Sequence, residues 1–216
     1  MFHDRAHEPG PRLIMGKRYA SGGEDQGVAI MKDLAASPHT ADHLAYKVAR
    51  HFVSDDPPTS LVVRLKQSYL RSDGDLAELA RTLISSPEAW DETPRKFKTP
   101  YEFLISTWRS VDTVPGDVHP LIGALTFMGQ KPFAPPSPKG WPEEAQVWCA
   151  PDAIIKRMNW SEAFATQAIG DRDPRQVADN ALGERLTPLV AQAIARAETR
   201  GEGLSILLMS PEFQRR

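Results

Sequence analysis

The apolar residues of this chain recur every three or four positions over most of its length. This spacing places them on one face of a helix, and it is clear in 41–52, 61–69, 76–84, 101–111 and 189–197. Shorter apolar stripes, through Val28, Met31 and Leu34 and through Ile154, Ile155 and Met158, predict two further helices. No window shows a convincing alternation of period two, which a half-buried strand would need. The pattern therefore predicts an all-α protein, a multi-helix bundle of about ten helices.

Helix starts are marked by a hydroxyl residue followed by proline, as at Ser37-Pro38, Thr99-Pro100 and Thr187-Pro188. Serine and threonine are good N-caps, and proline suits the first helical turn, where its missing N–H costs nothing. Gly201 is predicted to end the helix that begins at Pro188. These boundaries predict a single helical domain over residues 27–216.

The segment 129–150 interrupts the helical pattern. Five prolines lie between Gly129 and Trp148, and proline fixes φ and removes a backbone donor. We expect a semi-rigid, extended strap across the helices. Its aromatic residues Phe133, Trp141 and Trp148 are predicted either to be buried anchors or to line a groove for a carbohydrate or a peptide.

Residues 1–26 form a segment of a different character. Charged and histidine side chains crowd its start, and it lacks the apolar core of a secretory signal, so compartment stays unknown. We expect irregular chain, either a natural N-terminus or the continuation of a missing N-terminal half. His7 and Glu8, close to His3 and Asp4, could move protons or hold a divalent ion. The alternative is a polar loop.

Two further groups of residues could carry chemistry. His39 and His43 lie four apart on a predicted helix, a spacing that lets two imidazoles reach one metal, but their flank is typical of a solvated face. Lys98 and Arg109, with Glu102, could clamp a carboxylate or phosphate, or form an ion-pair network. We expect no cofactor.

Composition narrows the class of protein. The 216 residues carry a net charge of −2 with both signs interspersed, so no basic stripe favours nucleic acid as a partner. No apolar run is long enough for a membrane span. The single cysteine, Cys149, excludes an internal disulfide.

Six segments of the chain occur in the order typical of a known family: 7–19, 33–58, 74–90, 96–111, 128–141 and 210–216. In these segments, which read for example HEPGPRLIMGKRY, KFKTPYEFLISTWRSV and MGQKPFAPPSPKGW, the chain resembles the C-terminal half of the bacterial domain-of-unknown-function family 1800. The resemblance implies a helical fold and a longer intact protein. It also implies a possible partner, a neighbour-encoded protein that resembles sulfatases. It assigns no catalytic residue, and His39 stands where a small residue is expected.

Three functions are compatible with the sequence. The first is an interaction or binding module, the C-terminal part of a larger bacterial protein. The second is a hydrolase-type enzyme with a site near His7 and Glu8 that a missing half completes. The third is a structural component of an envelope or secreted assembly.

Overall fold

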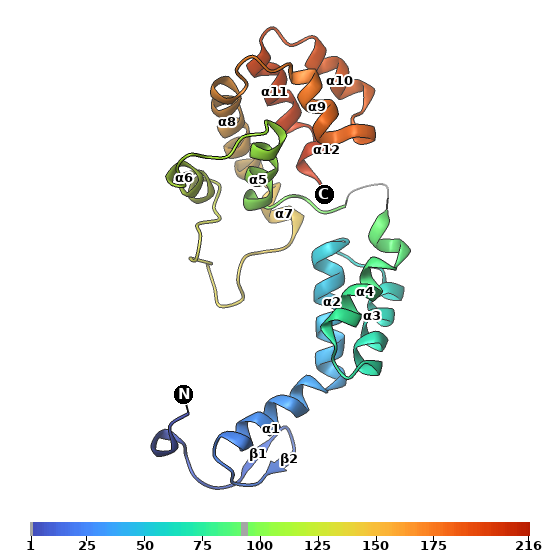
Figure 1. The fold of residues 1–216 in the computed structure, drawn as a ribbon, viewed down its shortest axis with the longest axis vertical. Helices are drawn as coiled ribbons and strands as arrows, with labels where there is room; N and C mark the ends of the chain where they lie inside the picture. Colours follow the sequence, from blue (N-terminus) through green and yellow to red (C-terminus); the bar gives the residue numbers. More distant parts are fainter. Residues whose placement is uncertain (1, 92–94) are drawn as a thin grey trace. The chain divides into compact units, whose positions relative to one another are not determined.

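The computed structural model describes residues 2–91 and 95–216, which form two compact units, Met1–Asp91 and Glu92–Arg216. The described residues contain twelve α-helices, three short 3-10 helices and one two-stranded sheet (Figure 1). The predicted all-α, multi-helix class is therefore confirmed. The predicted single domain over residues 27–216 stays a prediction, because two compact units can belong to one domain.

The first unit begins with a 3-10 helix, η1 (Asp4–Ala6), and a hairpin of β1 (Arg12–Ile14) and β2 (Lys17–Tyr19). The strands are antiparallel, with Arg12 opposite Tyr19. Met15 and Gly16 connect them with φ angles of 48° and 82°, as a tight type I′ turn requires. The sequence predicted irregular chain here, because strands of three residues are too short to show a readable alternation.

Polar contacts tie this hairpin to helix α1 (Glu24–Ala35). The buried Gln26 amide donates to the carbonyl oxygens of Ala20, at 2.8 Å, and Gly10, at 3.1 Å. The Tyr19 hydroxyl donates to Asp33 Oδ2 at 2.8 Å. The apolar residues of α1 do not form the buried face that their spacing suggests, since Met31 is exposed. Hydrogen bonds therefore attach α1 to the hairpin, whereas the sequence pattern predicted that the apolar residues of α1 would be buried.

Helices α2 (Pro38–Phe52), α3 (Thr59–Arg71) and α4 (Leu76–Ile84), followed by the 3-10 helix η2 (Pro87–Trp90), enclose the core of the first unit. Alanines line the inner face of α2, so its backbone can approach α3 closely. The buried residues of this core are Ala41, Ala45, Ala49, Leu61, Leu65, Tyr69, Leu79 and Leu83.

The second unit comprises α5 (Pro100–Ser110), α6 (His119–Phe127), α7 (Ala145–Trp148), α8 (Pro151–Ala168), α9 (Pro174–Leu182), η3 (Gly183–Arg185), α10 (Pro188–Ala195), α11 (Arg200–Met209) and α12 (Pro211–Gln214). Helix α11 packs against α8, α9 and α10 (Figure 1). Its residues Leu204, Leu207 and Leu208 are fully buried, so α11 is the central helix of this unit.

Two predictions about the second unit are wrong. Gly201 does not end a helix: α10 ends at Ala195, and Gly201 lies in the first turn of α11, where an added Cβ would lie 3.3 Å from Thr166 Cα of α8. Helix α8 buries Arg157 and Ser161, while Ile155 and Met158 of its predicted apolar face are exposed. Both features involve contacts between segments distant in the chain: Gly201 lies close to α8, and Arg157 donates to Gln214 and to the Lys98 carbonyl.

The strap, residues 129–150, contains no helix or strand between α6 and α7, and its last part forms α7 (Figure 1). Hydrogen bonds attach its two ends: the Tyr101 backbone N–H donates to Gln130 Oε1 at 2.8 Å, and Lys96 Nζ donates to the Glu143 carbonyl at 3.0 Å. Trp148 is buried and its indole N–H donates to the Pro142 carbonyl at 2.9 Å, as expected of an anchor. Phe133 is fully exposed, so its predicted role as a buried anchor is wrong.

Candidate anion-binding pocket

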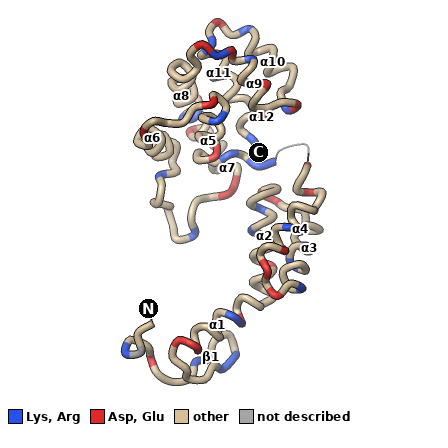
Figure 2. The backbone as a smooth tube through the Cα atoms, in the orientation of Figure 1, with Lys and Arg blue, Asp and Glu red and all other residues tan. Residues whose placement is uncertain are grey.

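Two segments of the second unit that are distant in sequence, 96–98 and 214–216, pair just before the start of α5. The Lys98 backbone N–H donates to the Gln214 carbonyl at 2.8 Å, and the Arg216 N–H donates to the Lys96 carbonyl at 2.9 Å. Phe97 and Arg215 form an antiparallel bridge between them. Because basic residues occupy both segments, this pairing gathers positive charge at one place in the fold (Figure 2).

A pocket of about 510 Å³ opens beside this pairing, between α5, α9, η3 and the C-terminal residues. Its lining combines basic, polar and apolar side chains, including Lys98, Arg109, Arg185, Arg216, Glu102, Asn180, Tyr101, Ile105, Leu182 and Phe213. These residues all belong to the second unit. The pocket is therefore complete within residues 92–216.

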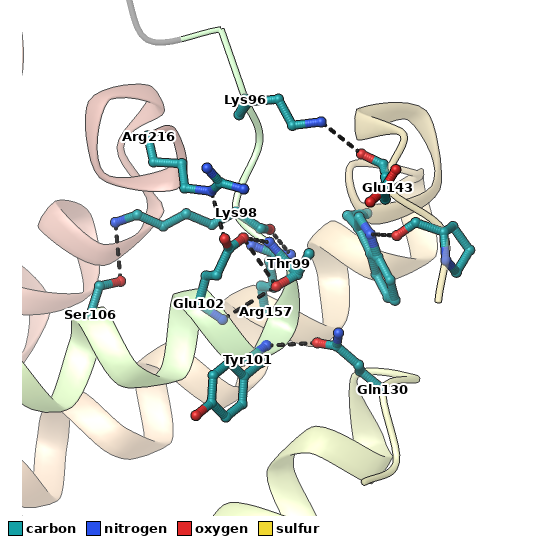
Figure 3. Close-up of polar contacts among 12 residues, drawn as sticks. Lys96, Lys98, Thr99, Tyr101, Glu102, Ser106, Gln130, Glu143, Arg157 and Arg216 are labelled. Atoms are coloured by element: carbon teal, nitrogen blue, oxygen red, sulfur yellow. Dashed lines mark hydrogen bonds and ion pairs between the residues drawn. The ribbon is translucent and has the colours of Figure 1, made fainter. Parts of the chain in front are cut away.

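Lys98 is one of the residues that line this pocket. Its Nζ donates to Ser106 Oγ at 3.0 Å (Figure 3). The same Nζ lies 4.0 Å from the centre of the Phe213 ring. Burial lowers the pKa of Lys98 to about 8, and the positive charge of Arg185 lowers this pKa as well. The folded chain thus holds a lysine whose charge is only partly compensated.

Glu102 has its negative charge satisfied by other groups. Its Oε2 accepts from the Thr99 backbone N–H at 2.8 Å and from Thr99 Oγ1 at 3.1 Å, which forms a capping box at the start of α5. Its Oε1 lies 2.6 Å from Arg216 Nε (Figure 3). Glu102 and Arg216 therefore balance each other and leave the other cations without this carboxylate as a direct partner.

Three cations that line the pocket make no ion pair with any residue in the described part of the chain: Lys98, Arg109 and Arg185. They come from the segment before α5, from α5 and from η3. The positive charge of Arg185 disfavours the protonated form of Lys98, and an oxyanion bound between them would relieve that repulsion. The arrangement is suited to binding an anion.

Arg157 lies next to the pocket but is not part of its lining, and its side chain is only 1% exposed. Its Nη2 donates to the Lys98 carbonyl at 2.6 Å and its Nη1 to Gln214 Oε1 at 2.7 Å. The guanidinium also lies 4.7 Å from the Phe97 ring centre. Burial lowers the pKa of Arg157 to about 10, so it stays charged at neutral pH. Arg157 thus holds the two paired segments in position.

The structure places the sequence-predicted Lys98 and Arg109 in one pocket, although both stay predictions as binding residues. Sequence analysis missed Arg185 and Arg216, which lie far along the chain from α5. No local spacing relates them to Lys98. The only available signal was the run of basic residues at the end of the chain.

The aromatic residues of the strap lie in different environments. Trp141 is half-buried and lines a pocket of about 230 Å³ with Trp148, Pro136 and Pro142, whereas Phe133 does not line it. The carbohydrate- or peptide-binding role of Trp141 and Trp148 stays a prediction.

The candidate histidines lie in the first unit. His7 is half-buried, with its Nε2 unpartnered among the described residues, while the exposed Glu8 carboxylate pairs with Arg12 Nη2 at 3.0 Å. His39 and His43 are exposed on α2. Over residues 2–91 and 95–216, no three His, Cys, Asp or Glu residues form a group able to hold a metal. These four residues stay predictions.

Comparisons with known proteins identify one family. The model of the family described as "Protein of unknown function (DUF1800)" matches residues 1–215. No curated protein and no solved structure matches the chain. Within the described residues, no helix has the length and apolar character needed to cross a membrane.

Proposed function

This chain belongs to the DUF1800 family, whose description names no activity, and from this premise we propose that it is a binding module whose ligand site is the basic pocket of residues 92–216. The ligand carries a carboxylate or phosphate group. This proposal refines the interaction module expected from the sequence by placing its site at Lys98 and Arg109.

One observation supports this proposal most directly: among the described residues, no carboxylate forms an ion pair with Lys98, Arg109 or Arg185. Surface lysine and arginine side chains are long enough to turn away from one another into solvent. Lys98 cannot do so freely, because it is half-buried, with its ammonium held between Ser106 and the Phe213 ring. Keeping a desolvated cation near the charges of Arg185 and Arg157 costs stability, and this cost is typical of a ligand-binding site.

The other functions considered stay predictions. They are the hydrolase-type enzyme with a site at His7 and Glu8, and the structural component of an envelope or secreted assembly. The neighbour-encoded, sulfatase-like partner also stays a prediction, since it is implied by resemblance alone.

Isothermal titration tests the proposed anion site. We expect citrate or phenyl phosphate to bind the full chain at about 50 mM salt and to bind more weakly at about 500 mM, because salt screens exposed charges. Arg109→Met should weaken binding about tenfold or more, since a charge-assisted hydrogen bond contributes about 1.5 kcal/mol or more.

Arg175→Met is the matched control. Arg175 lies on α9, and other residues of this helix line the pocket. Arg175 itself is not a lining residue and forms an ion pair with Asp173. The proposal fails if neither anion binds the wild-type chain, or if Arg109→Met and Arg175→Met reduce binding equally.

A further inference from the structure

The charge of the pocket favours a ligand with two negative charges. Glu102 forms its ion pair with Arg216, which leaves Lys98, Arg109 and Arg185 without an ion-pair partner among the described residues. A single carboxylate would balance one of these three cations. A dianion would balance two and leave a net positive site that still attracts it.

The origins of the three cations favour a phosphate group. Lys98 precedes α5, Arg109 is near the end of α5 and Arg185 ends η3, so the cations belong to three separate parts of the pocket wall. A phosphate monoester has three terminal oxygens that accept hydrogen bonds in three directions. A carboxylate has two oxygens, and both lie in one plane.

A further donor and an apolar wall complete the pocket. Asn180 Oδ1 accepts from Gln176 Nε2 at 3.1 Å, which leaves the Asn180 amide nitrogen available to donate. Tyr101, Ile105 and Leu182 supply apolar lining. The pocket volume of about 510 Å³ far exceeds that of a bare phosphate. The pocket therefore has room for an organic group of the ligand to contact this apolar lining.

We infer that the pocket binds a phosphate monoester dianion that carries an aromatic or aliphatic group. This inference rests on the proposed anion-binding function and goes further by naming the ligand class. In the bound state the phosphate accepts from Lys98, Arg109 and Arg185, and the organic group lies against Tyr101 and Ile105.

Three probes of similar size separate the alternatives at pH 7.5 and low salt. Phenyl phosphate is chiefly a dianion at this pH, because its second pKa is about 6. Phenyl sulfate has nearly the same shape but one negative charge, and phthalate carries two charges on two carboxylates. We expect phenyl phosphate to bind at least about tenfold more tightly than either, a difference of about 1.4 kcal/mol.

Variants test the assignment of residues in the same titration. Lys98→Met and Arg185→Met should each weaken phenyl phosphate about tenfold and reduce its preference over phenyl sulfate. Arg175→Met, outside the pocket, should change neither value. Far-ultraviolet circular dichroism confirms that each variant is folded before titration.

The outcomes separate this inference from the proposed function. If phenyl sulfate or phthalate binds as tightly as phenyl phosphate, the phosphate inference is overturned while the anion-binding proposal stands. If the charge variants leave the phosphate preference intact, the inference is overturned as well. If none of the three probes binds, the phosphate inference is overturned, and if citrate does not bind either, both proposals fail.

Discussion

At the scale of single residues, Lys98 of the basic pocket reduces the stability of the folded state. Burial and the charge of Arg185 lower its pKa from 10.5 to about 8. The folded state therefore binds the Lys98 proton more weakly than the unfolded state does. Below about pH 8 the protonated lysine reduces the free energy of unfolding, and this penalty disappears as the pH rises toward 10.5.

We predict that Lys98→Met stabilises the protein at pH 7. A pKa difference of one unit corresponds to about 1.4 kcal/mol, and because the ammonium is partly solvated we expect a gain of about 1–2 kcal/mol. The gain should shrink between pH 8 and pH 10.5, where the wild-type lysine loses its proton. Urea unfolding at several pH values measures both effects.

Lys139→Met is the control for this prediction, because Lys139 is exposed in the strap. We expect it to change the free energy of unfolding by less than about 0.5 kcal/mol at any of these pH values. A loss of stability in Lys98→Met at pH 7 would show that the contacts with Ser106 and Phe213 outweigh the cost of burying the charge.

At the scale of secondary-structure elements, two glycines set how closely α11 approaches its neighbours. A Cβ added at Gly203 would lie 2.8 Å from Pro174 Cγ, and one added at Gly201 would lie 3.3 Å from Thr166 Cα. The proline ring is rigid and Thr166 Cα is backbone, so neither neighbour moves easily. The absence of side chains here lets α11 lie against α8 and α9.

We predict that Gly203→Ala destabilises the protein by about 1–3 kcal/mol through overpacking, although alanine is the better helix former. The matched control is Gly123→Ala in the middle of α6, where an added Cβ meets nothing within 4 Å. This control should stabilise by about 0.5–1 kcal/mol. Thermal unfolding of both variants, followed by circular dichroism, measures the difference. Equal effects at the two positions would disprove the close contact between α11 and Pro174.

At the scale of the whole molecule, the two units have separate hydrophobic cores. The core of the first unit contains Leu65, and that of the second contains Leu207, both fully buried. Among the described residues, none belongs to both cores. All residues that line the basic pocket belong to the second unit.

We predict that Leu65→Ala costs the first unit about 2–5 kcal/mol, the range for a buried leucine. Hydrogen exchange of α2, α3 and α4 should accelerate, while phenyl phosphate affinity should stay within about twofold of the wild type, since Leu65 is not part of the pocket lining. Leu70→Ala on the same helix is the control, because Leu70 is 41% exposed. Unchanged exchange in Leu65→Ala, or lost binding without unfolding, would contradict this prediction.

The sequence by itself determined the helical class and many helix starts. Ser37-Pro38, Thr99-Pro100 and Thr187-Pro188 begin helices in the structure as predicted. Capping and apolar periodicity act within a few residues, so a short window contains all the information they need. Lys98 and Arg109 were found as candidates for the same reason, since both lie close to one helix.

Tertiary structure alone decided which faces are buried and which charges meet. Arg157 is buried because Gln214 and the Lys98 carbonyl, both distant in sequence, satisfy its hydrogen bonds. Arg216 joins Lys98 because the chain end pairs with the segment before α5, and Arg185 of η3 lines the same pocket. Contacts between segments far apart in the chain leave no periodic signal, and the energy of burying a polar group depends on partners that only the folded chain supplies.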